Sequence, residues 1–235
     1  MSGKPALILY FTVIVLFMIS IVFKIDELSL LTKPVIIPSI FFYYTQKNEG
    51  KMNWYYLLIV LIFFIGDMIV LVDLENSFRV IVPMFIVSYG LFLKALIEDS
   101  MKIRLSEIKS PHLFALLLCL FLLLYLFISS LDLLMEIQEG TVWLLIIYGT
   151  VLLLVGLVSS LNYIINPTRL SFLMILTSLC FVISDVFFVL KKYFLEAEML
   201  DYISNLAQAL SYFFLTRYFL LKSVSKNILN DDAAS

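Results

Sequence analysis

Eight long apolar segments divide almost the whole chain, and they constrain its fold more than any other feature of the sequence. A helix that crosses the hydrocarbon core of a bilayer needs about 20 apolar residues, with a range of roughly 17 to 25. The segments that meet or nearly meet this length are residues 6–23, 28–44, 54–73, 78–97, 111–131, 141–160, 169–190 and 202–221. Only short connections separate them. We therefore predict an all-α polytopic membrane bundle of about eight transmembrane helices.

The composition supports the same fold class. Of the 235 residues, 63% are hydrophobic and 14% are charged, whereas about a quarter of the residues in a soluble domain are charged. Lipid accepts apolar side chains on the outside of a bundle, and water does not. We predict one transmembrane domain over residues 1–226 and a flexible tail over residues 227–235. No basic cluster indicates nucleic-acid binding, so membrane lipids are the expected partners.

Lysine and arginine residues in the connections predict the orientation, because they are more frequent on the cytoplasmic side. One set lies at the N-terminus, in the second, fourth and sixth connections and after the last segment: Lys4, Lys47, Lys51, Lys102, Arg104, Lys109, Arg169, Lys222 and Lys226. The smaller set in the other connections is Lys24, Arg79, Lys191 and Lys192. We expect a multi-pass protein of a bacterial-type inner membrane, the cell membrane, with both termini cytoplasmic.

Three acidic or basic residues lie inside the predicted segments and away from both of their ends: Lys33, Asp67 and Asp185. On insertion scales each charge at mid-membrane costs roughly 2.5 to 3.5 kcal/mol. Three isolated charges would cost on the order of 8 to 10 kcal/mol, which is comparable with the net stability of a whole domain. We therefore expect the three residues to share partners or a hydrated cavity.

The depths of these residues predict that they meet. Each lies five or six residues from the outer boundary of its segment, which is roughly 8 to 9 Å at a rise of 1.5 Å per residue. Gln208 shares this level. Asn205, Gln208 and Tyr212 also form a polar stripe at helical spacing, which should face the interior of the bundle.

Two prolines beside Lys33 favour a cavity at this depth. Pro34 and Pro38 each remove a backbone donor, and the carbonyl groups that they free need partners or water inside a membrane. An ordinary proline kink is the alternative interpretation.

Five short motifs follow one another along the chain. They are TKP at 32–34, GD at 66–67, an F-x-x-S pattern with Phe85, Ser88 and Tyr89, SD at 184–185, and AQ at 207–208. Their order and spacing resemble the YhhN family of lysoplasmalogenase-like membrane proteins. The resemblance implies hydrolysis of the vinyl ether bond of a lysoplasmalogen to a fatty aldehyde and a glycerophospho-alcohol. A lysophospholipid or another single-chain lipid is then the expected partner.

The chain departs from the family pattern at two places. Tyr89 stands where the family commonly has histidine, and Thr177 and Ser178 stand where it commonly has Gly-Ala. The resemblance leaves open whether activity persists without that histidine.

Asp67 and Asp185 are the candidate catalytic residues. Proton transfer to the alkene carbon of a vinyl ether gives an oxocarbenium ion, and glycosidases meet a similar ion with one protonated and one ionised carboxyl group. Gly66 slightly favours Asp67 as the protonated acid, because glycine permits close approach of a substrate. The candidate supporting or substrate-binding residues are Lys33, Gln208, Asn205, Tyr89, Tyr148, Ser184 and Gly66. No cofactor is expected, and no metal, because Lys33 at the same depth would repel a hard cation.

Two other interpretations of the same residues stay open. Lys33, Asp67 and Asp185 could form a buried ionic network that only fixes helix packing in a non-catalytic, lipid-binding membrane protein. A proton-coupled carrier could also use paired carboxylates, a lysine and a proline-interrupted helix. Lys33 itself could bind a lipid phosphate, although its depth favours a role in holding the aspartates.

Overall fold

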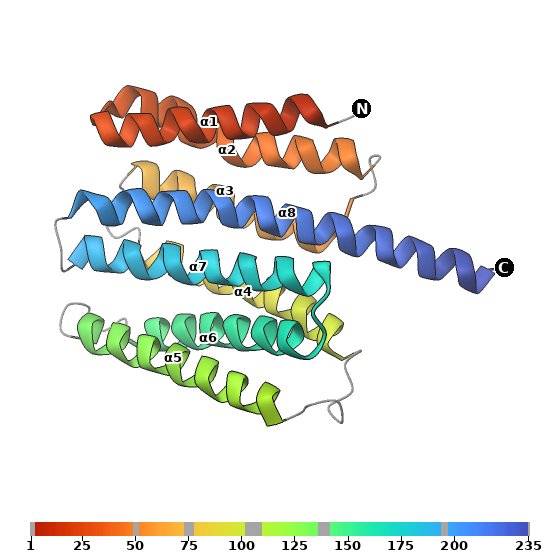
Figure 1. Cartoon of the computed structure of the whole chain (residues 1–235). Coiled ribbons are helices and arrows are strands. Elements are labelled where there is room, and N and C mark those ends of the chain that lie inside the picture. The colour runs from red at the N-terminus through yellow and green to blue at the C-terminus, as the bar shows by residue number, and fades with distance from the viewer. Residues whose placement is uncertain are drawn as a thin grey trace.

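In the part of the chain that the structure describes, residues 3–48, 52–72, 78–101, 110–135, 142–193 and 197–234, the computed structural model contains eight α-helices. They run alternately in opposite directions through one bundle (Figure 1). The helices are α1 (Lys4–Phe23), α2 (Asp26–Lys47), α3 (Trp54–Val72), α4 (Phe78–Ser100), α5 (Ser110–Met135), α6 (Val142–Ile165), α7 (Arg169–Tyr193) and α8 (Glu198–Ala234). Each predicted segment coincides with one helix, so the predicted fold class is confirmed. The flexibility of residues 227–235 stays a prediction.

Seven of the helices in the described residues, α1 to α7, are long and apolar enough to cross a membrane. The last helix, α8, falls outside this set because polar residues such as Asn205, Gln208 and Arg217 lower its hydropathy. It packs along α7 and also contacts α1, α2 and α3. Its polar side chains therefore find protein partners, as when Arg217 donates to the Tyr43 hydroxyl at 3.0 Å. The chain is a multi-pass membrane protein in which α8 completes the bundle.

The outward face of α5 is covered with large exposed apolar side chains. This helix lies at the edge of the bundle beside α6 (Figure 1). Its large side chains Phe114, Phe121 and Tyr125 are 70%, 65% and 67% exposed. Contiguous apolar surface of this kind fits contact with lipid better than contact with water.

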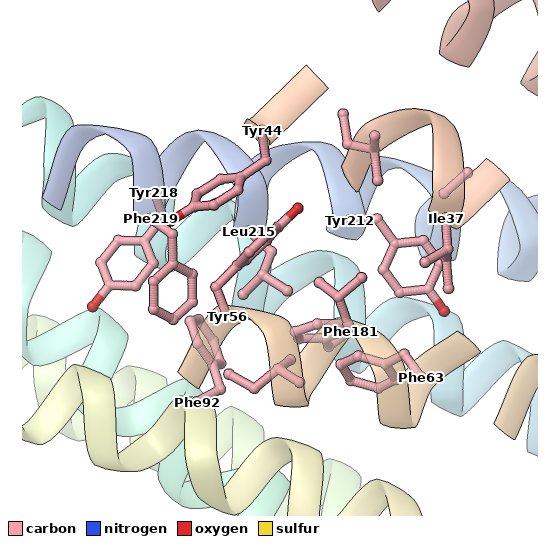
Figure 2. Close-up of a cluster of buried hydrophobic side chains, with 14 of the residues drawn as sticks. Ile37, Tyr44, Tyr56, Phe63, Phe92, Phe181, Tyr212, Leu215, Tyr218 and Phe219 are labelled. Atoms are coloured by element: carbon pink, nitrogen blue, oxygen red, sulfur yellow. The ribbon is translucent and has the colours of Figure 1, made fainter. Parts of the chain in front are cut away.

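A core of buried aromatic side chains joins α8 to α2, α3, α4 and α7 (Figure 2). The ring centroids of Tyr44 and Tyr56 lie 4.0 Å apart near one end of this core. Near the other end, the Phe63 ring packs 5.2 Å from Phe181 and 5.7 Å from Tyr212. The packing fixes the position of the Tyr212 ring, whose hydroxyl group reaches the candidate site.

An ion pair links the α1–α2 connection to the beginning of α8. Lys24 Nζ lies 2.5 Å from Glu198 Oε1. The hydrogen bond between the two groups, with their opposite charges, raises the pKa of Lys24 and lowers the pKa of Glu198. Both side chains are exposed, so the pair contributes little to stability.

A buried carboxylate that was not predicted from the sequence, that of Asp99, lies near the C-terminal end of α4. Asp99 is only 8% exposed, and its Oδ2 atom accepts from the Tyr218 hydroxyl at 2.7 Å and lies 3.0 Å from Lys222 Nζ. The predicted fourth segment ended at residue 97, so Asp99 was counted with the connection. The helix continues to Ser100, and the cluster of Asp99, Tyr218 and Lys222 ties α4 to α8.

Asp99→Asn is expected to lower the free energy of unfolding by about 2 to 3 kcal/mol, because it leaves the largely buried Lys222 without its nearer carboxylate. Glu98, at 3.8 Å, is the remaining and more exposed partner. Thermal unfolding in detergent measures the change, and Asp26→Asn at an exposed position is the matched control. An unchanged midpoint for Asp99→Asn would contradict a stabilising role for the cluster.

Candidate active site

A cavity of about 400 Å³ lies among the helices, near the end of the bundle where α1 meets α2 and α7 meets α8. Its size falls within the range of ligand sites, roughly 300 to 1,000 Å³. The helices α4 and α5 contribute only apolar side chains to its wall, whereas α2, α3, α7 and α8 supply the charged ones. Seven of the nine predicted site residues line it: Lys33, Asp67, Tyr148, Ser184, Asp185, Asn205 and Gln208. The structure thus brings together residues from five helices.

Asp67 is bound through both of its carboxyl oxygens. Gln208 Nε2 donates to Oδ1 at 2.7 Å, and the Tyr212 hydroxyl donates to Oδ2 at 2.7 Å. The side chain is buried, with 5% exposed. Since both donors come from α8, this helix holds the carboxyl group that α3 presents.

Asp185 is bound through one oxygen only. The hydroxyl groups of Tyr89 on α4 and Tyr148 on α6 donate to Oδ2 at 2.7 and 2.5 Å. Among the described residues, Oδ1 has no hydrogen-bond partner. The Asp185 side chain is half-buried and lines the cavity. Tyr89 does not line the cavity, but its hydroxyl group donates to the Asp185 carboxyl group from α4.

Lys33 shares the cavity with the two aspartates but forms no ion pair with them. Among the residues that the structure describes, no carboxylate oxygen lies within 4.0 Å of its Nζ atom. Its Nζ atom lies over the Phe17 ring, 5.7 Å from the ring centroid. Lys33 and Asp67 line the same cavity, so their opposite charges attract each other across it. Among the described residues, the Lys33 ammonium group has no hydrogen-bond acceptor.

The Phe85 ring lies beside Gly66, where the sequence had suggested the approach of a substrate. A Cβ atom at this position would lie 2.5 Å from Cε1 of Phe85. The missing side chain therefore makes room for the Phe85 ring, which itself lines the cavity. Gly66 shapes the wall of the site through Phe85, whose ring fills the space that the missing side chain leaves.

Contacts between α7 and α8 build the polar rim of the cavity. Ser204 Oγ donates to the Ser184 carbonyl oxygen at 2.8 Å. Asn205 Nδ2 donates to the carbonyl and carboxyl oxygens of Asp201 at 2.9 and 3.0 Å. Lys191 Nζ lies 2.6 Å from the other carboxyl oxygen of Asp201. This ion pair was not predicted, because both residues lie at the ends of their helices, where charge is common.

The fold and the site together define a multi-pass helical membrane protein in which two differently bound carboxyl groups face one largely apolar cavity. The chain belongs to the YhhN family, whose family model matches residues 28–223, a range that includes every predicted site residue. This confirms the resemblance that the five motifs indicated. The family groups lysoplasmalogenase-like membrane proteins and is associated with hydrolase activity. Comparisons with curated proteins and with solved structures gave no match.

Proposed function

We propose that this protein hydrolyses the vinyl ether bond of a single-chain phospholipid and releases a fatty aldehyde and a glycerophospho-alcohol. One observation carries the proposal: Asp67 and Asp185 face the same cavity but have unlike hydrogen bonds. Two carboxyl groups in unlike surroundings are what acid catalysis through an oxocarbenium ion requires. The apolar side of the cavity suits the alkenyl chain.

The hydrogen bonds favour Asp185 as the proton donor. Among the described residues only Oδ2 is hydrogen-bonded, by Tyr89 and Tyr148, which leaves Oδ1 to carry a proton. Asp67 accepts on both oxygens and interacts with the Lys33 cation, which suits an ionised group. This assignment reverses the slight preference that Gly66 suggested, since the space beside Gly66 is occupied by Phe85.

The reaction then proceeds by protonation of the alkene, addition of water and cleavage of the hemiacetal. Asp185 gives its proton to the alkene carbon C2, and the electron pair of the double bond forms the new C–H bond. Positive charge develops at C1 and on the ether oxygen, where the Asp67 carboxylate stabilises it. Water adds to C1 and returns a proton to Asp185, which gives a hemiacetal. Cleavage of the bond between C1 and the glycerol oxygen, with transfer of the hydroxyl proton to that oxygen, releases the aldehyde and the alcohol.

Hydrolysis in D₂O tests both the reaction and the position of proton transfer. Purified protein and a lysoplasmalogen are expected to give an aldehyde with one deuterium at C2, measured by mass spectrometry soon after mixing. The matched control is unlabelled aldehyde incubated with the protein, which measures exchange after release. Aldehyde without deuterium would contradict protonation at C2. Proton or solute movement across vesicles without any aldehyde would favour a carrier.

We also propose that the protein lies in a bacterial-type cell membrane with both termini in the cytoplasm. The two ends of the chain lie at the same end of the bundle (Figure 1), and most of the lysine and arginine residues of the connections belong to that end. The cavity would then open toward the outer leaflet. A reporter that is active only in the cytoplasm is expected to be active when fused after residue 226. Activity of a periplasmic reporter at the same position would show the opposite orientation.

A further inference from the structure

Among the residues that the structure describes, Lys33 differs from the other cavity lysine in having no carboxylate partner. Lys191 lines the same cavity and lies 2.6 Å from Asp201. Elsewhere in the described residues, Lys24 and Lys222 also have carboxylate partners, at 2.5 and 3.0 Å. A half-buried ammonium group that lines a largely apolar cavity is costly unless an anion accompanies it. Neither Asp67 nor Asp185 contacts the Lys33 ammonium group directly. A bound anion would neutralise its charge.

A second donor lies on the same face of α2. Ser29 precedes Lys33 by four residues, one turn of the helix, and both side chains line the cavity. Among the described residues, the Ser29 hydroxyl forms no hydrogen bond. A tetrahedral phosphate can accept from a hydroxyl and from an ammonium group at once, and lysine commonly binds phosphate as a point charge.

The cavity lining offers separate places for the parts of a single-chain phospholipid. Lys33 and Ser29 of α2 line it on one helix, and Asp67 and Asp185 line it from α3 and α7. The side chains that α4 and α5 add to the wall are all apolar. In a lysophospholipid the glycerol backbone separates the phosphate from the bond to the hydrocarbon chain. A phosphate at Lys33 would leave that bond beside the aspartates and the chain against the apolar side of the cavity.

We propose that Lys33, with Ser29 as a second donor, binds the phosphate of a single-chain lipid in this cavity and so selects phospholipids over neutral lipids. The proposal rests on the proposed function for the identity of the reacting lipid. The binding itself does not depend on the reaction and can be measured without it.

Three probes separate phosphate recognition from chain binding. The first is 1-O-hexadecyl lysophosphatidylcholine, whose saturated ether has no alkene to protonate. The second is 1-O-hexadecylglycerol, which has the same chain and no phosphate. Inorganic phosphate is the third and tests whether the anion alone is sufficient. Equilibrium binding of each probe is measured with the full chain in lipid nanodiscs.

Lys33→Met is expected to weaken binding of the phospholipid probe by about 10- to 100-fold, the loss of a charge-assisted hydrogen bond. Binding of the neutral ether should change by less than about 3-fold, because the apolar side of the cavity is untouched. Lys33→Arg should retain most of the preference for phosphate, since it keeps the charge. Lys191→Met is the matched control, and its effect should be smaller because Asp201 already neutralises that lysine.

Four results would overturn the proposal. Lys33→Met could bind the phospholipid probe as the wild type does, or it could lose both lipids to the same extent. Lys191→Met could have the larger effect. Inorganic phosphate could bind as tightly as the lipid and with the same dependence on Lys33, which would define a site for free anions. If Lys33 governs the preference for phosphate but no aldehyde forms from a lysoplasmalogen, the binding proposal holds and the proposed reaction is wrong.

Discussion

Asp185→Asn is expected to reduce the rate of aldehyde release from a lysoplasmalogen by about 1,000-fold, the contribution of a positioned general acid. The amide has nearly the shape of the carboxyl group, and its oxygen can still accept from Tyr89 and Tyr148. It cannot give a proton to carbon. Aldehyde release by the purified variant, measured against the wild type at equal concentration, checks the prediction.

The control for this variant separates chemistry from folding. Asp26→Asn changes an exposed carboxyl group in the first turn of α2 and should leave the rate unchanged. Both variants should give the helix content and the elution volume of the wild type. A folded Asp185→Asn protein with the wild-type rate would exclude Asp185 as the acid. A variant that cannot be isolated folded would instead support the interpretation of a purely structural network.

Asp67→Asn is expected to reduce the same rate by about 100-fold, because it removes the negative charge that stabilises the oxocarbenium ion. It should also lower the free energy of unfolding by about 1 to 3 kcal/mol. Gln208 and Tyr212 each donate to a different oxygen of Asp67, and one amide can accept from only one of them. Rate and thermal unfolding are measured on the same preparation.

A reciprocal exchange distinguishes the two effects of Asp67→Asn. Combining it with Gln208→Glu reverses the direction of one hydrogen bond, so that the new amide donates to the new carboxyl group. The double variant is expected to recover most of the lost stability but only part of the rate, because the negative charge is moved away from its original position. Full recovery of the rate would show that the exact position of the carboxylate does not matter and would contradict the assigned role.

The hydrogen-bond pattern also bears on the structural alternative. A network that only fixed helix packing would be expected to pair Lys33 with an aspartate, as Lys222 is paired with Asp99. Instead, neutral donors hold both aspartates: two donors from α8 hold Asp67, and one donor each from α4 and α6 holds Asp185. Lys33 lines the cavity without a carboxylate partner among the described residues. The charge of Lys33 therefore lies at the cavity. It stabilises helix packing less there than a direct ion pair with an aspartate would.

Helix geometry explains why much of the site could be predicted from the sequence. Each residue of a helix rises by a fixed distance, so counting from the end of an apolar segment gives depth directly. The counts placed Lys33, Asp67, Asp185 and Gln208 at one level, and the structure brings all four to one cavity. The polar stripe that includes Tyr212 also faces inward, where Tyr212 donates to Asp67.

Depth alone could not predict which groups pair. Pairing depends on the order of helices around the bundle and on the rotation of each helix about its axis, and neither follows from segment length. The sequence therefore did not show that Tyr89 and Tyr148 both bind Asp185 or that Phe85 fills the space beside Gly66. It also missed the Asp99 cluster, because hydropathy ended the fourth segment one turn too early.

The low hydropathy of α8 has a consequence for biosynthesis. This helix is made after the other seven and inserts into a membrane less readily by itself, so its insertion depends on the polar surface that α2, α3 and α7 already offer. It carries both donors to Asp67. Asp67 therefore gains both of these hydrogen-bond partners only after α8 has been made and inserted.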